Sequence, residues 1–160
     1  EGTYPLPEAQ LDRFMFNIWV DYPEYNDEIT IVKNTTTNQT QTLHHILTAE
    51  EILQFQNVIK NIPVNESIYE YAVKLVSKTR KGSEYAGDIA NKYLSWGAGP
   101  RASQYLIIGA KTHAVLNGKY SPDIEDVRAV ALHILRHRII RNYKAEAEGM
   151  TVEKIINELF

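Results

Sequence analysis

The interpretation of the whole chain depends on GAGPRASQYLIIGAKTHAVLNG, residues Gly97–Gly118. A Gly-Ala-Gly loop leads into Pro100, and proline favours the first turn of a helix because its ring presets φ and it has no N–H group. Small and apolar side chains then recur at helical spacing, and Asn117-Gly118 is a typical helix stop. The stretch therefore predicts a helix near residues 100–117.

Arg101 follows the proline directly, so its guanidinium is expected near the start of this helix. Backbone N–H groups at a helix start favour an anion, and an arginine there adds a planar fork that suits phosphate. The spacing by itself favours a plainer interpretation, an ordinary buried helix with a surface arginine. A second arginine, Arg13, follows Asp12, with which we expect a local ion pair of little energetic worth.

The composition is that of an ordinary globular domain. The chain has 160 residues, of which 44% are hydrophobic and 23% are charged. Its net charge of −3 argues against broad binding to nucleic acid. It contains no cysteine, which excludes a thiolate zinc site and fits a reducing compartment. No run of sequence approaches the roughly 18 apolar residues of a membrane span. We therefore expect a cytoplasmic location, with neither nucleic acid nor a membrane as partner.

Residues Phe14–Asp21 alternate in a way that is typical of a β-strand. One face carries Phe14, Phe16, Ile18 and Val20, and the other carries Met15, Asn17, Trp19 and Asp21. Both faces bear large apolar groups, so we expect this strand to be covered on two sides. No other part of the sequence is a convincing partner, and a lone strand is unstable. The sequence therefore predicts that part of a sheet is missing, or that another chain supplies it.

Most of the remaining sequence predicts helices. Thr48 and Glu51 form a capping-box pair, and acidic residues near helix starts and basic residues near helix ends match the helix dipole. The predicted helices cover residues 8–13, 24–33, about 49–62, from about 66 to a stop at Gly82, from a start at Tyr120-Ser121-Pro122 to about Tyr143, and a last short helix capped by Thr151. Residues 34–42 are polar and predict a loop, and residues 83–96 are ambiguous.

The sequence contains no common catalytic or metal-binding motif. It has no G-x-x-x-x-G-K-[ST], G-x-G-x-x-G, H-E-x-x-H or G-x-S-x-G pattern. His44 and His45 are adjacent, so their side chains would point apart. His133 and His137 are four residues apart on one predicted helix face, but no third ligand completes a site. We therefore predict no metal site.

Three stretches resemble one known family. EGTYPLPEAQLDRF, residues 1–14, is very similar to the segment that follows the sensor 1 strand in MoxR-type AAA+ ATPases. GAGPRASQYLIIGAK, residues 97–111, resembles the sensor 2 helix of that family, with Gly99 where the family often has serine. YSPDIEDVRAVALHILRHRI, residues 120–139, is similar to the lid of the family. The resemblance covers nearly the whole chain in the order of the family.

The resemblance implies a mainly α fold, the C-terminal part of such an ATPase. Residues 1–33 would be a remnant of the α/β P-loop core, with a helix and its last strand, and residues 34–42 a polar loop. Residues 43–160 would be the helical AAA+ lid domain, with the sensor 2 helix near residues 100–117. The strand that lacks a partner agrees with a sheet completed elsewhere in the parent protein.

The resemblance also implies roles for the two arginines. Arg13 matches the arginine finger, which reaches the γ-phosphate bound by a neighbouring subunit, and Arg101 matches the sensor 2 arginine. The intact parent would bind ATP and magnesium, whereas this piece would hold neither and would be inactive, because it lacks the P-loop lysine, the Walker B acid and the sensor 1 asparagine.

The expected partners are other subunits of a hexameric ring and client proteins, including ones with von Willebrand A domains, that the parent would remodel or mature. An alternative of another class is a helical interaction domain without enzymatic activity. It would dock onto a partner by adding its exposed strand, Phe14–Asp21, to a sheet.

Overall fold

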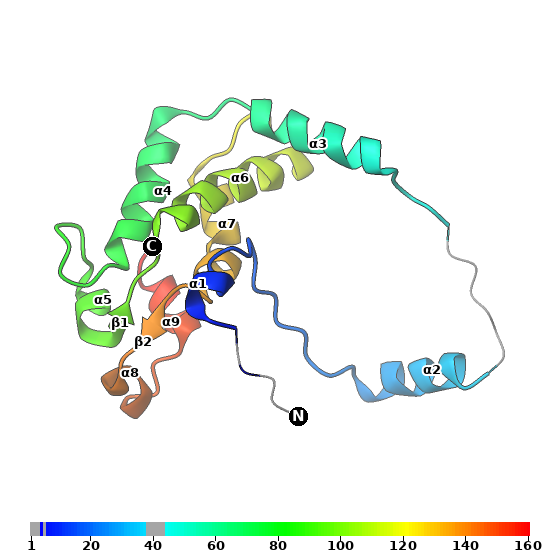
Figure 1. Cartoon of the computed structure of the whole chain (residues 1–160), viewed down its shortest axis with the longest axis horizontal. Coiled ribbons are helices and arrows are strands. Elements are labelled where there is room, and N and C mark those ends of the chain that lie inside the picture. The colour runs from blue at the N-terminus through cyan, green and yellow to red at the C-terminus, as the bar shows by residue number, and fades with distance from the viewer. Residues whose placement is uncertain (1–3, 5, 38–43) are drawn as a thin grey trace.

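The computed structural model describes residues 4, 6–37 and 44–160. These residues are mostly helical, which confirms the predicted fold class (Figure 1). The helices are α1 Glu8–Leu11, α2 Tyr25–Thr35, α3 Ala49–Asn61, α4 Glu66–Lys78, α5 Asp88–Tyr93, α6 Pro100–Leu116, α7 Ile124–Leu135, α8 Tyr143–Ala147 and α9 Val152–Asn157. The strands are β1 Leu94–Trp96 and β2 Ile140–Arg141. Among these described residues, none of the helices is both long enough and apolar enough to cross a membrane.

The core lies where α6 and α7 pack against each other and α4 packs against both. The buried residues of α4 are Ile68, Ala72, Leu75 and Val76, which share one face because they lie at helical spacing. Small residues on α6 allow close packing, and the Cα of Gly109 faces Val130 of α7. Side chains that are fully buried here include Leu75, Val76, Leu106, Val127, Ile134 and Leu135.

A buried carboxylate fixes the turn between α6 and α7. Asp123 and Asp126 cap the start of α7 reciprocally, and the fully buried Asp126 also lies 2.7 Å from His113 Nδ1 and 3.1 Å from Lys119 Nζ. Hydrogen bonds from Lys119 lower the pKa of Asp123 and, in return, raise the pKa of Lys119. The predicted start at Tyr120-Ser121-Pro122 is therefore wrong, because Asp123 is the N-cap residue and α7 begins directly after it.

The helix predicted to run to about Tyr143 ends instead at Leu135. The next residues turn, and Ile140–Arg141 forms β2, which pairs antiparallel with β1 beside α5, α8 and α9. Asn142 caps α8 and Thr151 caps α9, the second as predicted. This ribbon resolves the ambiguous residues 83–96 as the short helix α5 followed by a strand.

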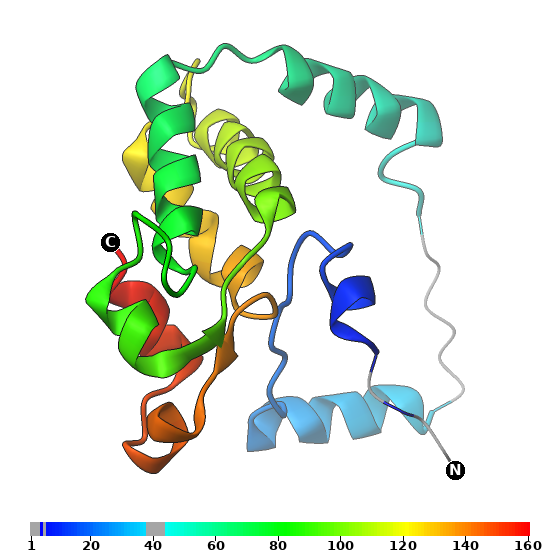
Figure 2. The same cartoon turned by 60° about the vertical axis from the view of Figure 1, so that its left-hand side comes forward.

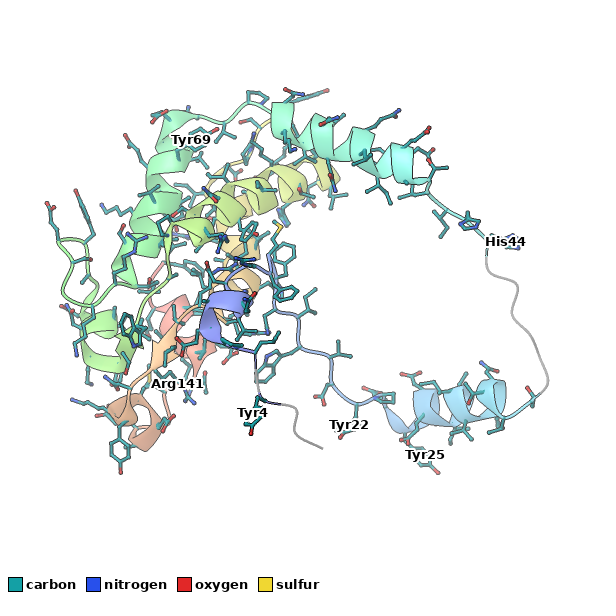
Figure 3. All side chains as sticks on the ribbon, viewed as in Figure 1. Tyr4, Tyr22, Tyr25, His44, Tyr69 and Arg141 are labelled. Carbon is teal, nitrogen blue, oxygen red and sulfur yellow. The ribbon has the colours of Figure 1, made fainter. Side chains whose placement is uncertain are left out.

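Helices α2 and α3 lie at the edge of the molecule and bury no residue (Figures 1 and 2). Figure 3 shows Tyr22 and Tyr25 far from the helical body. The capping box of Thr48 and Glu51 is confirmed, because it forms within one helical turn and needs no tertiary contact. Helix α2 runs through Thr35, two residues beyond the predicted end, and positions 38–42 of the predicted loop lie outside the described residues.

The predicted strand Phe14–Asp21 does not form in this structure. The segment is extended, but within the described residues it joins no ladder. Its backbone bonds to helical elements instead, since Asn17 N–H donates to the carbonyl oxygen of His133 at 2.9 Å. The second half of the segment is exposed, with Ile18 at 67% and Val20 at 90%. The side chains of this segment do alternate in the sequence, but the sheet that the segment would join is not part of the described chain.

The loop before α6 offers a matched pair of glycine substitutions. A Cβ on Gly97 would lie 2.3 Å from the carbonyl oxygen of Thr79, whereas a Cβ on Gly99 would meet nothing within 4 Å. We predict that Gly97→Ala lowers the free energy of unfolding by about 2 kcal/mol or more, because backbone must move, and that Gly99→Ala changes it by less than about 0.5 kcal/mol. Urea titrations of both variants test this. Equal stability of the two variants would contradict the close approach.

Candidate functional site

The two arginines predicted from the sequence lie close together, where the N-terminal segment meets the first turns of α6. Arg101 occupies the position after Pro100 in the first turn of α6, and its side chain is 42% exposed. The neighbouring Ala102 is fully buried, so the helix start is fixed in the core while the guanidinium faces outward. Arg13 follows α1, and its side chain is exposed.

Asp12 connects Arg101 to a third arginine, Arg138. The carboxylate oxygen Oδ2 of Asp12 lies 2.5 Å from Arg101 Nη1, and Oδ1 lies 3.0 Å from Arg138 Nε. The expected local pair of Asp12 with Arg13 is not among the ion pairs of the described residues. The carboxylate turns toward the helical body, where two guanidinium groups bind it.

Arg138 is the buried member of this group. Its side chain is 1% exposed and lies in the turn after α7. Besides Asp12 Oδ1, it donates to the carbonyl oxygens of Asp12 at 2.8 Å, Phe14 at 2.6 Å and Met15 at 3.3 Å, and to that of Ile134. Burial lowers the pKa of Arg138, and the Asp12 carboxylate acts against this. Hydrogen bonds therefore occupy the whole guanidinium, and four of its partners belong to the N-terminal segment.

Two further side chains of the helical body hold the same segment. The Tyr105 hydroxyl donates to the carbonyl oxygen of Arg13 at 2.9 Å. His137 Nε2 lies 3.0 Å from the carbonyl oxygen of Phe14 and must carry the hydrogen, because a carbonyl oxygen can only accept. The backbone on both sides of Arg13 is thus bonded to the helical body, and the Arg13 side chain makes no ion pair with the described residues.

A small cavity of about 160 Å³ lies beside Asp12 and the loop before α6. Its lining is Glu8, Asp12, Trp96, Gly97, Gly99, His137, Arg138 and Ile140. Sites for whole small-molecule ligands usually enclose about 300–1,000 Å³. The cavity is therefore too small to enclose a nucleotide, and the guanidinium in its lining, that of Arg138, is already bonded to the chain.

The structure offers no metal site among the described residues, since no three His, Cys, Asp or Glu side chains gather there. His44 is exposed at the edge of the molecule, as Figure 3 shows, and His45 is exposed beside it. His133 is on α7, whereas His137 is in the turn after it, so the expected shared helix face is wrong. The Asp12 carboxylate is bonded to two arginines, so ligands for a magnesium ion would have to come from elsewhere.

Comparison with known proteins finds similar proteins of one kind. Residues 86–159 match the family described as AAA lid domain. The chain is 35% identical over 159 residues to Chaperone MoxR1 of Mycobacterium tuberculosis, covering 99% of this chain and 42% of that protein. It is 27% identical over 174 residues to Protein MoxR of Paracoccus denitrificans, covering 100% of this chain and 51% of that protein. The chain is similar to MoxR-type AAA+ proteins over nearly its whole length. The resemblance stated from the sequence is confirmed.

The chain spans about half the length of the curated relatives that it matches. Uncharacterised protein YeaC of Bacillus subtilis is 32% identical over 160 residues, covering 99% of this chain and 47% of that protein. A crystal structure of a candidate ATPase from Cytophaga hutchinsonii superposes with a TM-score of 0.87 at 38% identity, over 99% of this chain and 48% of that one. Because the match covers 99% of the chain, it includes the N-terminal segment as well as the helical body.

Sequence reasoning found Arg13 and Arg101 but missed the residues that join them. Arg138 was assigned to a helix that was expected to continue, so nothing local marked it as a buried partner of Asp12. The two are 126 residues apart, and a single sequence gives no signal of a contact across that separation.

The pH dependence of stability tests the position of His137. Burial lowers its pKa below the ordinary value of about 6.5, and nearby Arg138 lowers it further, although the bond to Phe14 and the charge of Asp12 act against this. The unfolded chain then binds a proton at higher pH than the folded chain. The stability contributed by the neutral ring is complete above about pH 6.5 and is lost as pH falls through the interval down to the lowered pKa.

We predict that His137→Gln reduces this loss of stability in acid, because glutamine has no charge to gain. Urea titrations of the wild type and the variant from about pH 8 to pH 5 measure it. Identical slopes of unfolding free energy against pH would show that His137 is not held in its neutral form.

Proposed function

We propose that this chain is the lid and sensor 2 region of an ATP-hydrolysing AAA+ protein, in which Arg13 acts on the nucleotide bound by a neighbouring subunit. One observation carries the proposal. Arg13 and Arg101 lie on the same junction, since Asp12 binds Arg101 and Tyr105, one turn further along α6, binds the backbone of Arg13. The similarity to MoxR-type proteins and the match of residues 86–159 to the AAA lid domain support it.

Phosphoryl transfer explains why the exposed Arg13 and the half-buried Arg101 would be presented at one junction. Negative charge spreads over the oxygens of the transferred group, and a positioned guanidinium stabilises that charge without rearranging. An arginine finger supplied by another subunit can accelerate hydrolysis by about 10³ to 10⁵. Arg13 is exposed and makes no ion pair with the described residues, so its guanidinium is available for this role.

We further propose that Arg101 acts on the same nucleotide as Arg13. The side chain of Asp12, the residue before Arg13, touches Arg101 directly. Two arginines so close together in one chain would face one triphosphate rather than two in separate sites. If Arg13 reaches the nucleotide of a neighbour, Arg101 then does so as well, and sensor 2 acts between subunits.

The exposed apolar surface of the N-terminal half is consistent with a missing core. Large apolar side chains with more than half of their surface exposed include Ile18, Trp19 and Val20 of the extended segment, Val32 of α2, and Leu53, Phe55 and Val58 of α3. In our proposal the nucleotide-binding half of the parent covers this surface and pairs with the Phe14–Asp21 segment. That half would also provide the residues that bind ATP and magnesium.

We propose that the parent forms a ring, in the cytoplasm, and couples hydrolysis to remodelling or maturation of other proteins. The ring follows from a finger that acts between subunits, since each subunit then needs a neighbour. The chaperone role is suggested by the name of the relative Chaperone MoxR1. Clients with von Willebrand A domains remain part of the proposal on the strength of the family resemblance.

Substitution of the finger tests the enzymatic role. We predict that Arg13→Ala in the intact protein lowers ATP turnover by about 10³-fold or more, because transition-state charge loses its stabilisation. Nucleotide affinity should stay within about twofold, because the finger contributes to a site on another subunit. Lys144→Ala removes an exposed cation on α8 and is the control. Wild-type turnover in Arg13→Ala would contradict the proposal.

Mixed rings test which nucleotide Arg101 contacts. Subunits with Arg13→Ala and subunits with Arg101→Ala are each expected to be inactive. If both arginines of a subunit serve the same neighbour, every interface in a mixture lacks one of them, and activity stays absent. If Arg101 instead acts on the nucleotide of its own subunit, some nucleotides have both arginines: Arg101 from the subunit that carries Arg13→Ala, and Arg13 from a neighbour that carries Arg101→Ala. Recovery of ATP turnover on mixing would therefore overturn the assignment of Arg101.

A further inference from the structure

We propose that Tyr105, His137 and Arg138 are positioning residues that hold the backbone of the arginine finger. We call these three side chains the carbonyl cradle. The inference rests on the proposed role of Arg13 and goes beyond it, because none of the three side chains need contact a nucleotide. Together they bond the carbonyl oxygens of three consecutive residues, 12, 13 and 14.

Arg138 binds the backbone on both sides of Arg13. It donates to the carbonyl oxygen of Asp12 at 2.8 Å and to that of Phe14 at 2.6 Å, the residues immediately before and after Arg13. A guanidinium presents its donors in a rigid planar fork, so two such bonds fix the direction of the backbone as well as its place. The Arg138 side chain is 1% exposed, which leaves it no alternative partner in solvent.

Tyr105 holds the finger residue itself. Its hydroxyl donates to the Arg13 carbonyl oxygen at 2.9 Å, and its ring lies 5.1 Å from the guanidinium carbon of Arg138. The two cradle residues thus support each other through a cation–π contact. Since the three carbonyl oxygens are held, the mobile part of Arg13 is its side chain, which extends from a fixed backbone.

The cradle residues belong to the same body as Arg101. Tyr105 is on α6 one turn after Arg101, and His137 and Arg138 are in the turn that follows α7, the packing partner of α6. A shift of this helical body therefore moves both arginines together. Misplacement of a catalytic group by about 1 Å can cost two orders of magnitude in rate, so the cradle would determine whether the finger is effective.

A purely structural tether is the competing explanation, and Tyr105→Phe separates the two. The substitution keeps the ring and its contact with Arg138 and removes one hydroxyl. In the intact ATPase we expect kcat to fall about two- to tenfold with KM for ATP unchanged, because the finger contributes mainly in the transition state. Tyr143→Phe is the matched control, since Tyr143 is 84% exposed.

A double-mutant cycle shows whether Tyr105 acts through Arg13. Single-turnover hydrolysis is measured for Tyr105→Phe, Arg13→Ala and the double variant. We expect no further loss when Tyr105→Phe is added to Arg13→Ala, because an absent finger needs no positioning. Equal losses in both backgrounds, or a wild-type kcat in Tyr105→Phe, would overturn the cradle.

Arg138→Lys provides a second variant at the buried position. Lysine keeps the charge but lacks the planar fork, so we expect a larger loss of kcat than for Tyr105→Phe, again only while Arg13 is present. Failure of the cradle is distinguishable from failure of the proposed function. Normal turnover in Arg13→Ala refutes the finger, whereas inactive Arg13→Ala with a normal Tyr105→Phe refutes the cradle alone.

Discussion

The constraint on which the rest of this structure depends is that a buried guanidinium must have its N–H groups satisfied. Arg138 is almost fully enclosed, and all but one of its partners belong to residues 12–15. A buried charge without partners costs several kcal/mol of stability. Detachment of the N-terminal segment from the helical body would leave Arg138 without most of its partners and is therefore costly in free energy. The interaction therefore orders a segment that makes no sheet of its own in the described chain.

Several features at the junction follow from this constraint. The Asp12 carboxylate is drawn toward Arg138 and thereby reaches Arg101 at the start of α6. The Arg13 side chain, on the next residue, is exposed and forms no ion pair with the described residues. The close contact between Gly97 and Thr79 fixes the loop that leads into α6, so the position of Arg101 depends on core packing. The close packing at Gly97 and the position of the two arginines are thus connected through the loop that leads into α6.

The sequence predicted those elements whose signals are local. The capping box of Thr48 and Glu51 and the stop at Gly118, with φ of +74°, depend on neighbours within one turn. Prediction failed where distant groups decide. The apolar pattern continued past Leu135 and gave no reason to end a helix there, and the alternation of Phe14–Asp21 had no sheet to join. Arg13 and Arg101 were found by resemblance, whereas Arg138 could not be, because its partner is 126 residues away.

Amide hydrogen exchange tests the central claim most directly, because it measures local opening of the N-terminal segment. Asn17 N–H donates to the carbonyl oxygen of His133 just beyond the residues that Arg138 holds. We predict that this amide is protected in the wild type and exchanges rapidly in Arg138→Met, while the amide of the buried Ala110 in α6 stays protected in both. Rapid exchange at Asn17 in the wild type, or protection that survives in Arg138→Met, would contradict the account.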